Sequence, residues 1–170
     1  MFKIVEKCVP DQVCEDLILL GEQNGFKTSL FNGVLDNTFR NSLSSRFTST
    51  DVLSELLVKH CPEEYNGKKF IGLTAQEINI LKYNHGNYFK PHTDGVHVDK
   101  EGNMSKITVQ VYLNDVEEGG ETKFYINGKV YALKPKKGTV AFFDHFIVQE
   151  GAKVKKGVKY TFRINAMYSP

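Results

Sequence analysis

The second half of the chain alternates between apolar and polar residues, which predicts β-strands. The clearest case is Lys106–Asn114, where apolar residues at 107, 109, 111 and 113 alternate with the polar-face residues Thr108, Gln110 and Tyr112. Further strands are predicted at Phe2–Val5, Glu77–Tyr83, Thr122–Ile126, Lys129–Leu133, Thr139–Phe143 and Val158–Tyr168. Asn127-Gly128 separates two of them and is typical of a two-residue hairpin turn.

Helical spacing occurs only in the first third of the chain. A helix is predicted to begin at Pro10-Asp11, to carry Val13, Leu17 and Leu20 on one face, and to end at Gly25. A second helix is expected after a cap at Ser49–Asp51, with an apolar stripe at residues 52, 53, 56 and 57, ending at Cys61-Pro62. Helices at the front and many short strands behind them predict an α+β, mainly β fold. We expect a β-sandwich or jelly roll with flanking N-terminal helices.

Composition sets limits on the class of protein. A length of 170 residues predicts a single domain over 1–170, with a helical support region at 1–68 and a β core at 69–170. An apolar fraction of 41%, a charged fraction of 25% and a net charge of +2 are ordinary and indicate no nucleic-acid partner. Neither a signal peptide nor a membrane span is recognised, and the three cysteines follow no disulfide pattern. We therefore expect no membrane partner and a cytoplasmic location.

The most informative stretch is Tyr83–Gly95, which contains the pair His92 and Asp94. On an extended strand, residues two apart point to the same side, so an imidazole and a carboxylate can converge on one ion. Two histidines and one carboxylate on one face form the ligand set of non-haem Fe(II) oxygenases. A His-x-Asp pair alone is a weak signal, because many chains of this length contain one.

Four blocks make the signal specific. They are YNHGNYFKPHTDG, VYLNDVEEGGETKF, LKPKKGTVAFF and EGAKVKKGVKYTFRINAMY, in this order between Tyr83 and Tyr168. In these blocks the chain resembles the prolyl 4-hydroxylase-like branch of the Fe(II)/2-oxoglutarate dioxygenases. The resemblance implies a double-stranded β-helix, which agrees with the predicted strands.

The resemblance also implies roles for individual residues. His92 and Asp94 would be the catalytic iron ligands, Tyr83 would hydrogen-bond 2-oxoglutarate, and Lys159 would pair with its far carboxylate. Independently, Lys159, Thr161 and Arg163 alternate with apolar residues, so all three are expected inside the barrel. Arg163 is the competitor for the carboxylate, because a guanidinium binds carboxylates bidentately, and Thr161 is expected to add a hydroxyl.

One position departs from the family pattern. Where the third iron ligand, a histidine, is expected, this chain has Gln149. An amide oxygen is a weaker donor for Fe(II) than an imidazole nitrogen. The nearest alternative is His145, but on one continuous strand from 139 to 149 it would lie roughly 13 Å from Gln149. His97 has no positional support.

By resemblance, the expected activity is Fe(II)- and 2-oxoglutarate-dependent hydroxylation of a peptidyl proline in a protein or peptide partner. The cofactors would be Fe(II), 2-oxoglutarate and O2, with ascorbate as a further candidate, and the co-products would be succinate and CO2. Gln149 leaves open a catalytically impaired or inactive form, either natural or engineered. A non-catalytic β-barrel binding protein and a structural jelly roll are the rival classes. The oligomeric state is not predicted.

Overall fold

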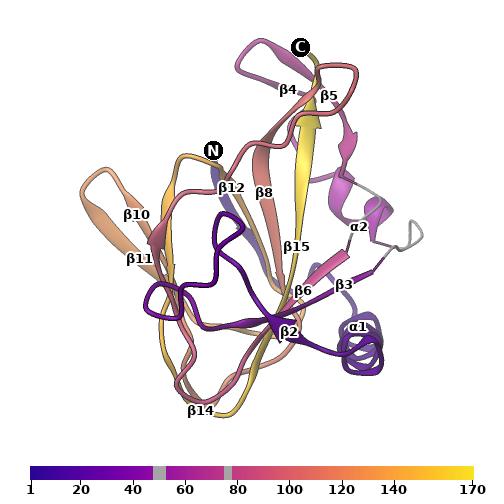
Figure 1. Cartoon of the computed structure of the whole chain (residues 1–170). Helices are drawn as coiled ribbons and strands as arrows, with labels where there is room; N and C mark the ends of the chain where they lie inside the picture. The colour runs from indigo at the N-terminus through magenta and orange to yellow at the C-terminus, as the bar shows by residue number, and fades with distance from the viewer. Residues whose placement is uncertain (48–52, 75–77) are drawn as a thin grey trace.

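The chain is mainly antiparallel strand, arranged as a large sheet, a smaller sheet that faces it and a short ladder at one end (Figure 1). A computed structural model describes residues 1–47, 53–74 and 78–170. The described helices lie in the first 58 residues, as expected from the sequence. The architecture therefore confirms the α+β, mainly β class.

The large sheet holds most of the strands predicted from alternation. Its order is β1 (Phe2–Val5), β12 (Val140–Asp144), β8 (Met104–Tyr112), β15 (Lys159–Tyr168), β6 (Ile78–Tyr83), β3 (Leu43–Phe47) and β2 (Lys27–Thr28). β5 (Lys68–Leu73) also pairs with β15, and β4 (Glu64–Tyr65) pairs with β5. The first 68 residues thus contribute strands as well as helices to the fold.

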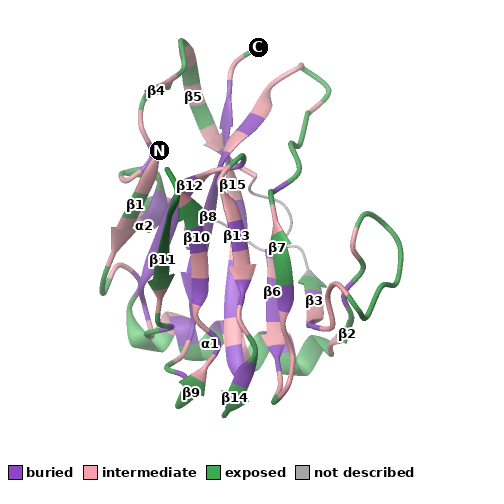
Figure 2. Ribbon diagram, turned by 90° about the vertical axis from the view of Figure 1, so that its left-hand side faces the viewer, coloured by how far each residue is buried: buried purple, intermediate pink, exposed green. Residues whose placement is uncertain are grey.

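The small sheet runs in the order β11 (Lys129–Leu133), β10 (Thr122–Ile126), β13 (Val148–Gly151) and β7 (Phe89–His92). β14 (Val154–Lys156) and β9 (Glu118–Gly119) form the short ladder. Asn127 and Gly128, between β10 and β11, both have positive φ, as the predicted hairpin turn requires. Figure 2 shows buried residues along the central strands and exposed residues on β11 and in the loops.

The helices flank the large sheet. α1 (Asp11–Asn24) begins after Pro10 and ends at Gly25, whose φ is +83°. Its buried face carries Cys14, Leu17 and Gly21, whereas Leu20 is 40% exposed, so the predicted stripe is rotated by one position. The reason is Gly21: a Cβ there would lie only 3.0 Å from Phe26, so this face packs close to its neighbours.

The second helix, α2 (Ser54–Val58), buries Leu57. Its predicted cap at Ser49–Asp51 lies outside the described residues. The main core lies between these helices and the large sheet, and it contains Ile107, Val109 and Val111 of β8. The opposite face of β8, with Thr108, Gln110 and Tyr112, is turned toward the small sheet, where Tyr112 packs with Phe124. The alternation predicted for this strand is confirmed.

Residues 139–149 do not form one strand, so the separation of about 13 Å between His145 and Gln149 that one continuous strand would give does not apply. β12 ends at Asp144, a turn follows, and β13 begins at Val148 on the other sheet. The turn is held by Asp144, whose Oδ1 accepts a hydrogen bond from the Phe146 amide at 2.8 Å. His145 therefore lies in the turn after β12, whereas Gln149 lies on β13 of the small sheet, and their positions must be considered separately.

Candidate functional site

One face of β15 carries a row of polar side chains between the sheets. Lys159, Thr161 and Arg163 alternate with core residues such as Phe162 and Ile164. In register, Lys159 lies opposite Tyr83 on β6. Lys159 and Thr161 are buried, at 2% and 1% exposure, while Arg163 is half-buried. The row therefore becomes more accessible from residue 159 toward residue 163.

His92 ends β7, and its side chain is only 8% exposed. Its ring stacks on Phe89, with the ring centroids 3.5 Å apart. Its Nδ1 lies 2.7 Å from the carbonyl oxygen of Lys90. Because a carbonyl only accepts, Nδ1 carries the hydrogen and Nε2 keeps its lone pair. Burial lowers the pKa of His92, which favours the neutral ring that binds metals.

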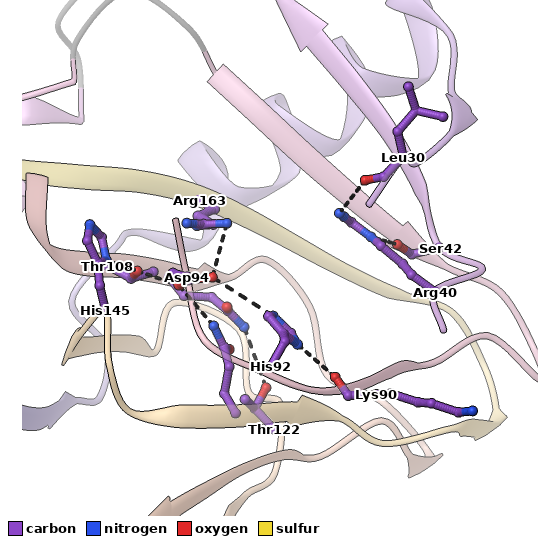
Figure 3. A network of polar contacts seen from close by, with 12 residues as sticks. Leu30, Arg40, Ser42, Lys90, His92, Asp94, Thr108, Thr122, His145 and Arg163 are labelled. Atoms are coloured by element: carbon purple, nitrogen blue, oxygen red, sulfur yellow. Dashed lines mark hydrogen bonds and ion pairs between the residues drawn. The ribbon is translucent and has the colours of Figure 1, made fainter. Parts of the chain in front are cut away.

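Asp94 follows two residues later and presents its two carboxylate oxygens to different partners (Figure 3). Its Oδ2 accepts hydrogen bonds from Thr108 Oγ1 at 2.5 Å and from Gln149 Nε2 at 3.0 Å. Its Oδ1 lies 3.2 Å from Arg163 Nη1 and 3.9 Å from His92 Nε2. The Asp94–His92 distance is too long for a hydrogen bond. A lone pair and an anionic oxygen therefore face each other across a gap.

Gln149 lies on β13 directly opposite His92 on β7 and is 5% exposed. Gln149 therefore lies beside His92 and Asp94, the pair predicted to bind iron, and its amide nitrogen donates a hydrogen bond to Asp94. Among the described residues, no three histidine, cysteine or carboxylate side chains converge as a metal site. The protein donors that converge here are His92, Asp94 and the Gln149 amide.

His145 does not replace the missing histidine. Its Nδ1 is 2.9 Å from Thr108 Oγ1, and its Nε2 is 2.8 Å from Ser105 Oγ. Since Thr108 donates to Asp94, it accepts from Nδ1–H, and Nε2 accepts from Ser105. Burial lowers the pKa of His145 to about 4, so the ring is neutral. It supports the Thr108–Asp94 hydrogen bond, while His97 lies farther out and bonds to Ser105 through its backbone.

Lys159 occupies the deep end of the row. Its Nζ is 3.3 Å from Thr122 Oγ1 and lies over the rings of Tyr83 and Tyr112, 5.1 and 5.7 Å from their centroids. Burial lowers its pKa to about 7. Among the described residues it forms no ion pair. A buried ammonium without a carboxylate is unfavourable, so this pocket is suited to an anionic ligand.

Thr161 and Arg163 lie between this pocket and the opening. Thr161 Oγ1 is buried and has no hydrogen-bond partner in the described part of the chain, which leaves a hydroxyl for a ligand near Lys159. Arg163 is placed beside Asp94 rather than beside Lys159. The two cations considered as alternatives from the sequence therefore lie at different depths.

Two contributors were not predicted from the sequence. Thr122 on β10 bonds both to Lys159 and to Tyr112, whose hydroxyl donates to it at 2.8 Å. Arg40 lies over the Phe89 ring at 4.4 Å and donates to Ser42 at 2.8 Å. Thr122 begins a predicted strand, and its inward direction depends on register alone. Arg40 lies in a polar segment with no periodicity, so no sequence signal marks it.

The residues at this site fit Fe(II) and 2-oxoglutarate, with Gln149 as a weak donor to the iron. A neutral imidazole and a carboxylate that face each other across 3.9 Å suit a divalent cation between them. The unpaired Lys159 and the Thr161 hydroxyl suit the far carboxylate of a dicarboxylate. Gln149 contributes a neutral amide where an imidazole would bind more strongly.

The fold and this donor set define a class of protein, the non-haem iron oxygenases. Residues 78–166, just over half of the chain, match the model of the 2OG-Fe(II) oxygenase superfamily, and the chain belongs to this superfamily.

Among curated proteins, the chain is 28% identical over 150 residues to probable prolyl 4-hydroxylase 11 of Arabidopsis thaliana; the match covers 84% of this chain and 51% of the relative. It is 33% identical over 88 residues to probable prolyl 4-hydroxylase 7 of the same plant, covering 41% of this chain and 28% of the relative. The chain thus spans about half the length of the first of these relatives and less of the second.

Solved structures share the fold. A Pseudomonas putida prolyl 4-hydroxylase aligns with a TM-score of 0.77 at 12% identity, over 97% of this chain and 91% of that one. A Trichoplax adhaerens prolyl hydroxylase, in complex with a hypoxia inducible factor peptide fragment, aligns at 0.78 and 18% identity, over 97% and 82%. A viral collagen prolyl hydroxylase from Paramecium bursaria Chlorella virus-1 aligns at 0.65 and 23% identity, over 99% and 96%. These similarities confirm the double-stranded β-helix expected from the sequence.

The described helices offer no membrane span, since none combines the necessary length with sufficient apolar character.

Proposed function

We propose that the protein is an Fe(II)- and 2-oxoglutarate-dependent hydroxylase that acts on peptidyl proline. In this proposal, His92 and Asp94 hold the iron and the Gln149 amide oxygen is a weak third donor. Lys159, Tyr83 and Thr161 hold 2-oxoglutarate. The observation that carries the proposal is the buried Lys159, which forms no ion pair among the described residues, since Glu121 acts on it only from beyond ion-pair distance. Lys159 also lies on the strand that brings Arg163 to Asp94.

The residues of the chain prepare the site for this chemistry. The Lys90 carbonyl fixes the His92 tautomer, and Thr108, held by His145, orients Asp94. Lys159 in a low-dielectric pocket would bind a carboxylate strongly and orient the co-substrate. When bound, Fe(II) and 2-oxoglutarate would supply an oxidant that inserts one oxygen atom of O2 into a C–H bond, giving succinate and CO2.

The substrate class is supported by the relatives. The curated relatives are named probable prolyl 4-hydroxylases, and the Trichoplax enzyme is described in complex with a peptide fragment. A protein or peptide with an accessible proline is therefore the proposed partner. Ascorbate belongs in the assay as a reductant that keeps iron in the Fe(II) state.

A second candidate is a catalytically impaired or inactive form, and Gln149 is the observation that favours it. Its amide nitrogen, not its oxygen, contacts Asp94. Ligation through the oxygen requires the side chain to turn and to release a buried hydrogen bond, which is worth about 1.5–3 kcal/mol when one partner is charged. Iron binding would then be weakened both by a poorer donor and by the lost contact.

The decisive experiment compares the unmodified protein with Gln149→His. Affinity for Fe(II) is measured anaerobically, and succinate release from 2-oxoglutarate is measured with O2, ascorbate and a proline-containing peptide. We expect slow iron-dependent release in the unmodified protein and at least about tenfold faster release in Gln149→His, because imidazole is the stronger donor. The control is His92→Ala in both backgrounds, which should abolish release.

The other outcomes separate the alternatives. Activity found only in Gln149→His would establish the inactive form. Release of succinate by neither protein would overturn the enzyme assignment and favour a binding protein built on the same fold.

A further inference from the structure

Arg163 is the charged residue of the β15 row to which the proposed function gives no role. Its side chain points at Asp94, with Nη1 3.2 Å from Oδ1 (Figure 3). Lys159, four residues earlier on the same face, is roughly 13 Å away along the strand and faces a different pocket. The role of Arg163 therefore lies at Asp94 itself.

Asp94 carries a negative charge that is almost completely removed from water. Its side chain is 1% exposed, and a carboxylate buried to this extent needs a partner of opposite charge. Thr108 and Gln149 donate uncharged hydrogen bonds to Oδ2. In the described part of the chain, Arg163 is the one permanently charged cation within ion-pair distance of this carboxylate. Arg163 is thus the internal counter-ion of Asp94.

The oxygen that Arg163 contacts is also the one turned toward His92. Asp94 Oδ1 lies 3.9 Å from His92 Nε2, whereas Oδ2 is occupied by Thr108 and Gln149. Oδ1 is therefore the oxygen that a metal held by this pair would use. A guanidinium and a divalent cation at one oxygen atom repel each other, so each weakens the binding of the other.

The contact between Arg163 and Asp94 can be released without disturbing the sheet. Its length of 3.2 Å exceeds the roughly 2.7–2.9 Å of a strong charged hydrogen bond. The Arg163 side chain is 27% exposed, so its guanidinium has access to water, which the Asp94 carboxylate lacks. The backbone at Arg163 is fixed by pairing with Asn79 on β6 and Gln110 on β8. Only the side chain has to move.

We propose that Arg163 competes with Fe(II) for Asp94 Oδ1 and thereby limits the affinity of the site for its metal. Arg163 stabilises the metal-free protein by neutralising the buried carboxylate, and its guanidinium turns toward water when the metal binds. This inference deepens the proposed function and rests on it for the identity of the metal. The competition itself can be measured without turnover.

The test compares the unmodified protein with Arg163→Gln, in the absence of 2-oxoglutarate. Free Mn(II) is counted by electron paramagnetic resonance, and the stability of the chelator-treated proteins is measured by urea denaturation. We expect Arg163→Gln to bind Mn(II) at least about tenfold more tightly, which corresponds to 1.4 kcal/mol. The same variant should unfold at a lower urea concentration. These opposite changes distinguish competition from a structural role, because damage to the site would lower both quantities.

Two control variants separate charge from other effects. Arg163→Lys keeps the positive charge, so its Mn(II) affinity should stay within about threefold of that of the unmodified protein. Lys82→Gln removes a cation from a matched ion pair, since Lys82 of β6 lies 2.6 Å from Glu22 of α1 on the opposite face of the sheet. It should lower stability slightly and leave Mn(II) affinity unchanged.

A further measurement needs no variant. Hydroxyphenylglyoxal modifies accessible guanidinium groups, and peptide mapping reports each arginine separately. Adding Mn(II) to the unmodified protein should speed the modification of Arg163, because the guanidinium is then turned toward water.

The inference is overturned if Arg163→Gln binds Mn(II) no more tightly than the unmodified protein, or if either control variant gains as much affinity. It is also overturned if Mn(II) leaves the modification of Arg163 unchanged or slows it. Absence of Fe(II)-dependent succinate release from every protein, with the Mn(II) results as expected, would overturn only the proposed function.

Discussion

At the scale of single residues, Asp94 determines what the site can accept. One of its oxygens is occupied by two donors, Thr108 and Gln149, and the other faces His92 and Arg163. A glutamine stabilises this arrangement without metal, because its N–H offsets part of the buried negative charge. A second carboxylate at position 149 would instead add negative charge beside Asp94 and destabilise the metal-free site.

Gln149→Glu should therefore destabilise the metal-free protein and increase its response to metal. Two buried carboxylates repel each other when both are charged, so the loss should be larger at pH 8 than at pH 5.5, where a proton can be shared between them. We expect a loss of about 1–3 kcal/mol at pH 8, measured by urea denaturation, and recovery on adding Mn(II).

Gln149→Leu provides the comparison. It removes the hydrogen bond but adds no charge, so its loss of stability relative to the unmodified protein should be nearly the same at pH 5.5 and pH 8, and Mn(II) should restore less of that loss than in Gln149→Glu. Equal stability of Gln149→Glu and the unmodified protein at pH 8, with no response to Mn(II), would contradict the placement of this side chain beside Asp94.

At the scale of elements, the turn at Gly138 joins distant parts of the chain. Gly138 has φ of +77°, and its carbonyl accepts hydrogen bonds from the amides of Cys8 and Val9. A Cβ at this position would lie 2.4 Å from the Val9 carbonyl oxygen, which is backbone and cannot move easily. The close approach connects the loop before α1 to the start of β12.

Gly138→Ala should consequently destabilise the protein by about 2–4 kcal/mol, through positive φ and a backbone clash. Gly128→Ala is a sharp control: its φ is +74°, but a Cβ there meets nothing within 4 Å. It should cost only about 1 kcal/mol. Chemical denaturation measures both, and equal losses would show that the clash is relieved elsewhere.

Strands with one face in the core were predictable, because burial on one side produces alternation. β10 was predicted with its observed bounds, and β8 was shifted by two residues. β11 was also predicted with its observed bounds, although it is exposed along almost its whole length. β7 and β13 have four residues each, too few for a periodic signal, and Pro91 interrupts the first. The strand before the turn at Asp144 was predicted at Thr139–Phe143, within one residue of its observed bounds at both ends.

The residues of the candidate site likewise divide into those that the sequence could predict and those that it could not. His92, Asp94, Tyr83 and Lys159 were accessible from a local motif and from ordered sequence blocks. The roles of Thr122 and His145 were not, because each depends on contacts with residues far away in the sequence. Sequence spacing states which face of a strand a residue occupies, but not what lies opposite.

At the scale of the whole molecule, Lys159 should lower stability as long as no anion is bound. Burial lowers its pKa from 10.5 to about 7, so folding favours the neutral amine. The unfolded chain binds more protons between these values, and stability should rise with pH from about 7 toward 10.5. Below about pH 7 the full penalty of burying the ammonium remains.

Lys159→Met should thus raise the melting temperature of the ligand-free protein, more at pH 6 than at pH 9. The same variant should lose the stabilisation that 2-oxoglutarate gives the unmodified protein with Mn(II). Differential scanning calorimetry with and without ligand measures both effects. A variant that melts lower at pH 6, with ligand stabilisation preserved, would show that Lys159 is not an unpaired buried cation.

Strand β15 is paired with β8 on one side and with β6 and then β5 on the other. Its inward row carries Lys159, the proposed co-substrate anchor, and Arg163, the neighbour of the proposed iron ligand Asp94. A single inserted or deleted residue in this strand would turn part of this row to the opposite face of the sheet, toward the main core. Natural variation in length should therefore be confined to the loops, while the spacing between these two cations is inherited unchanged.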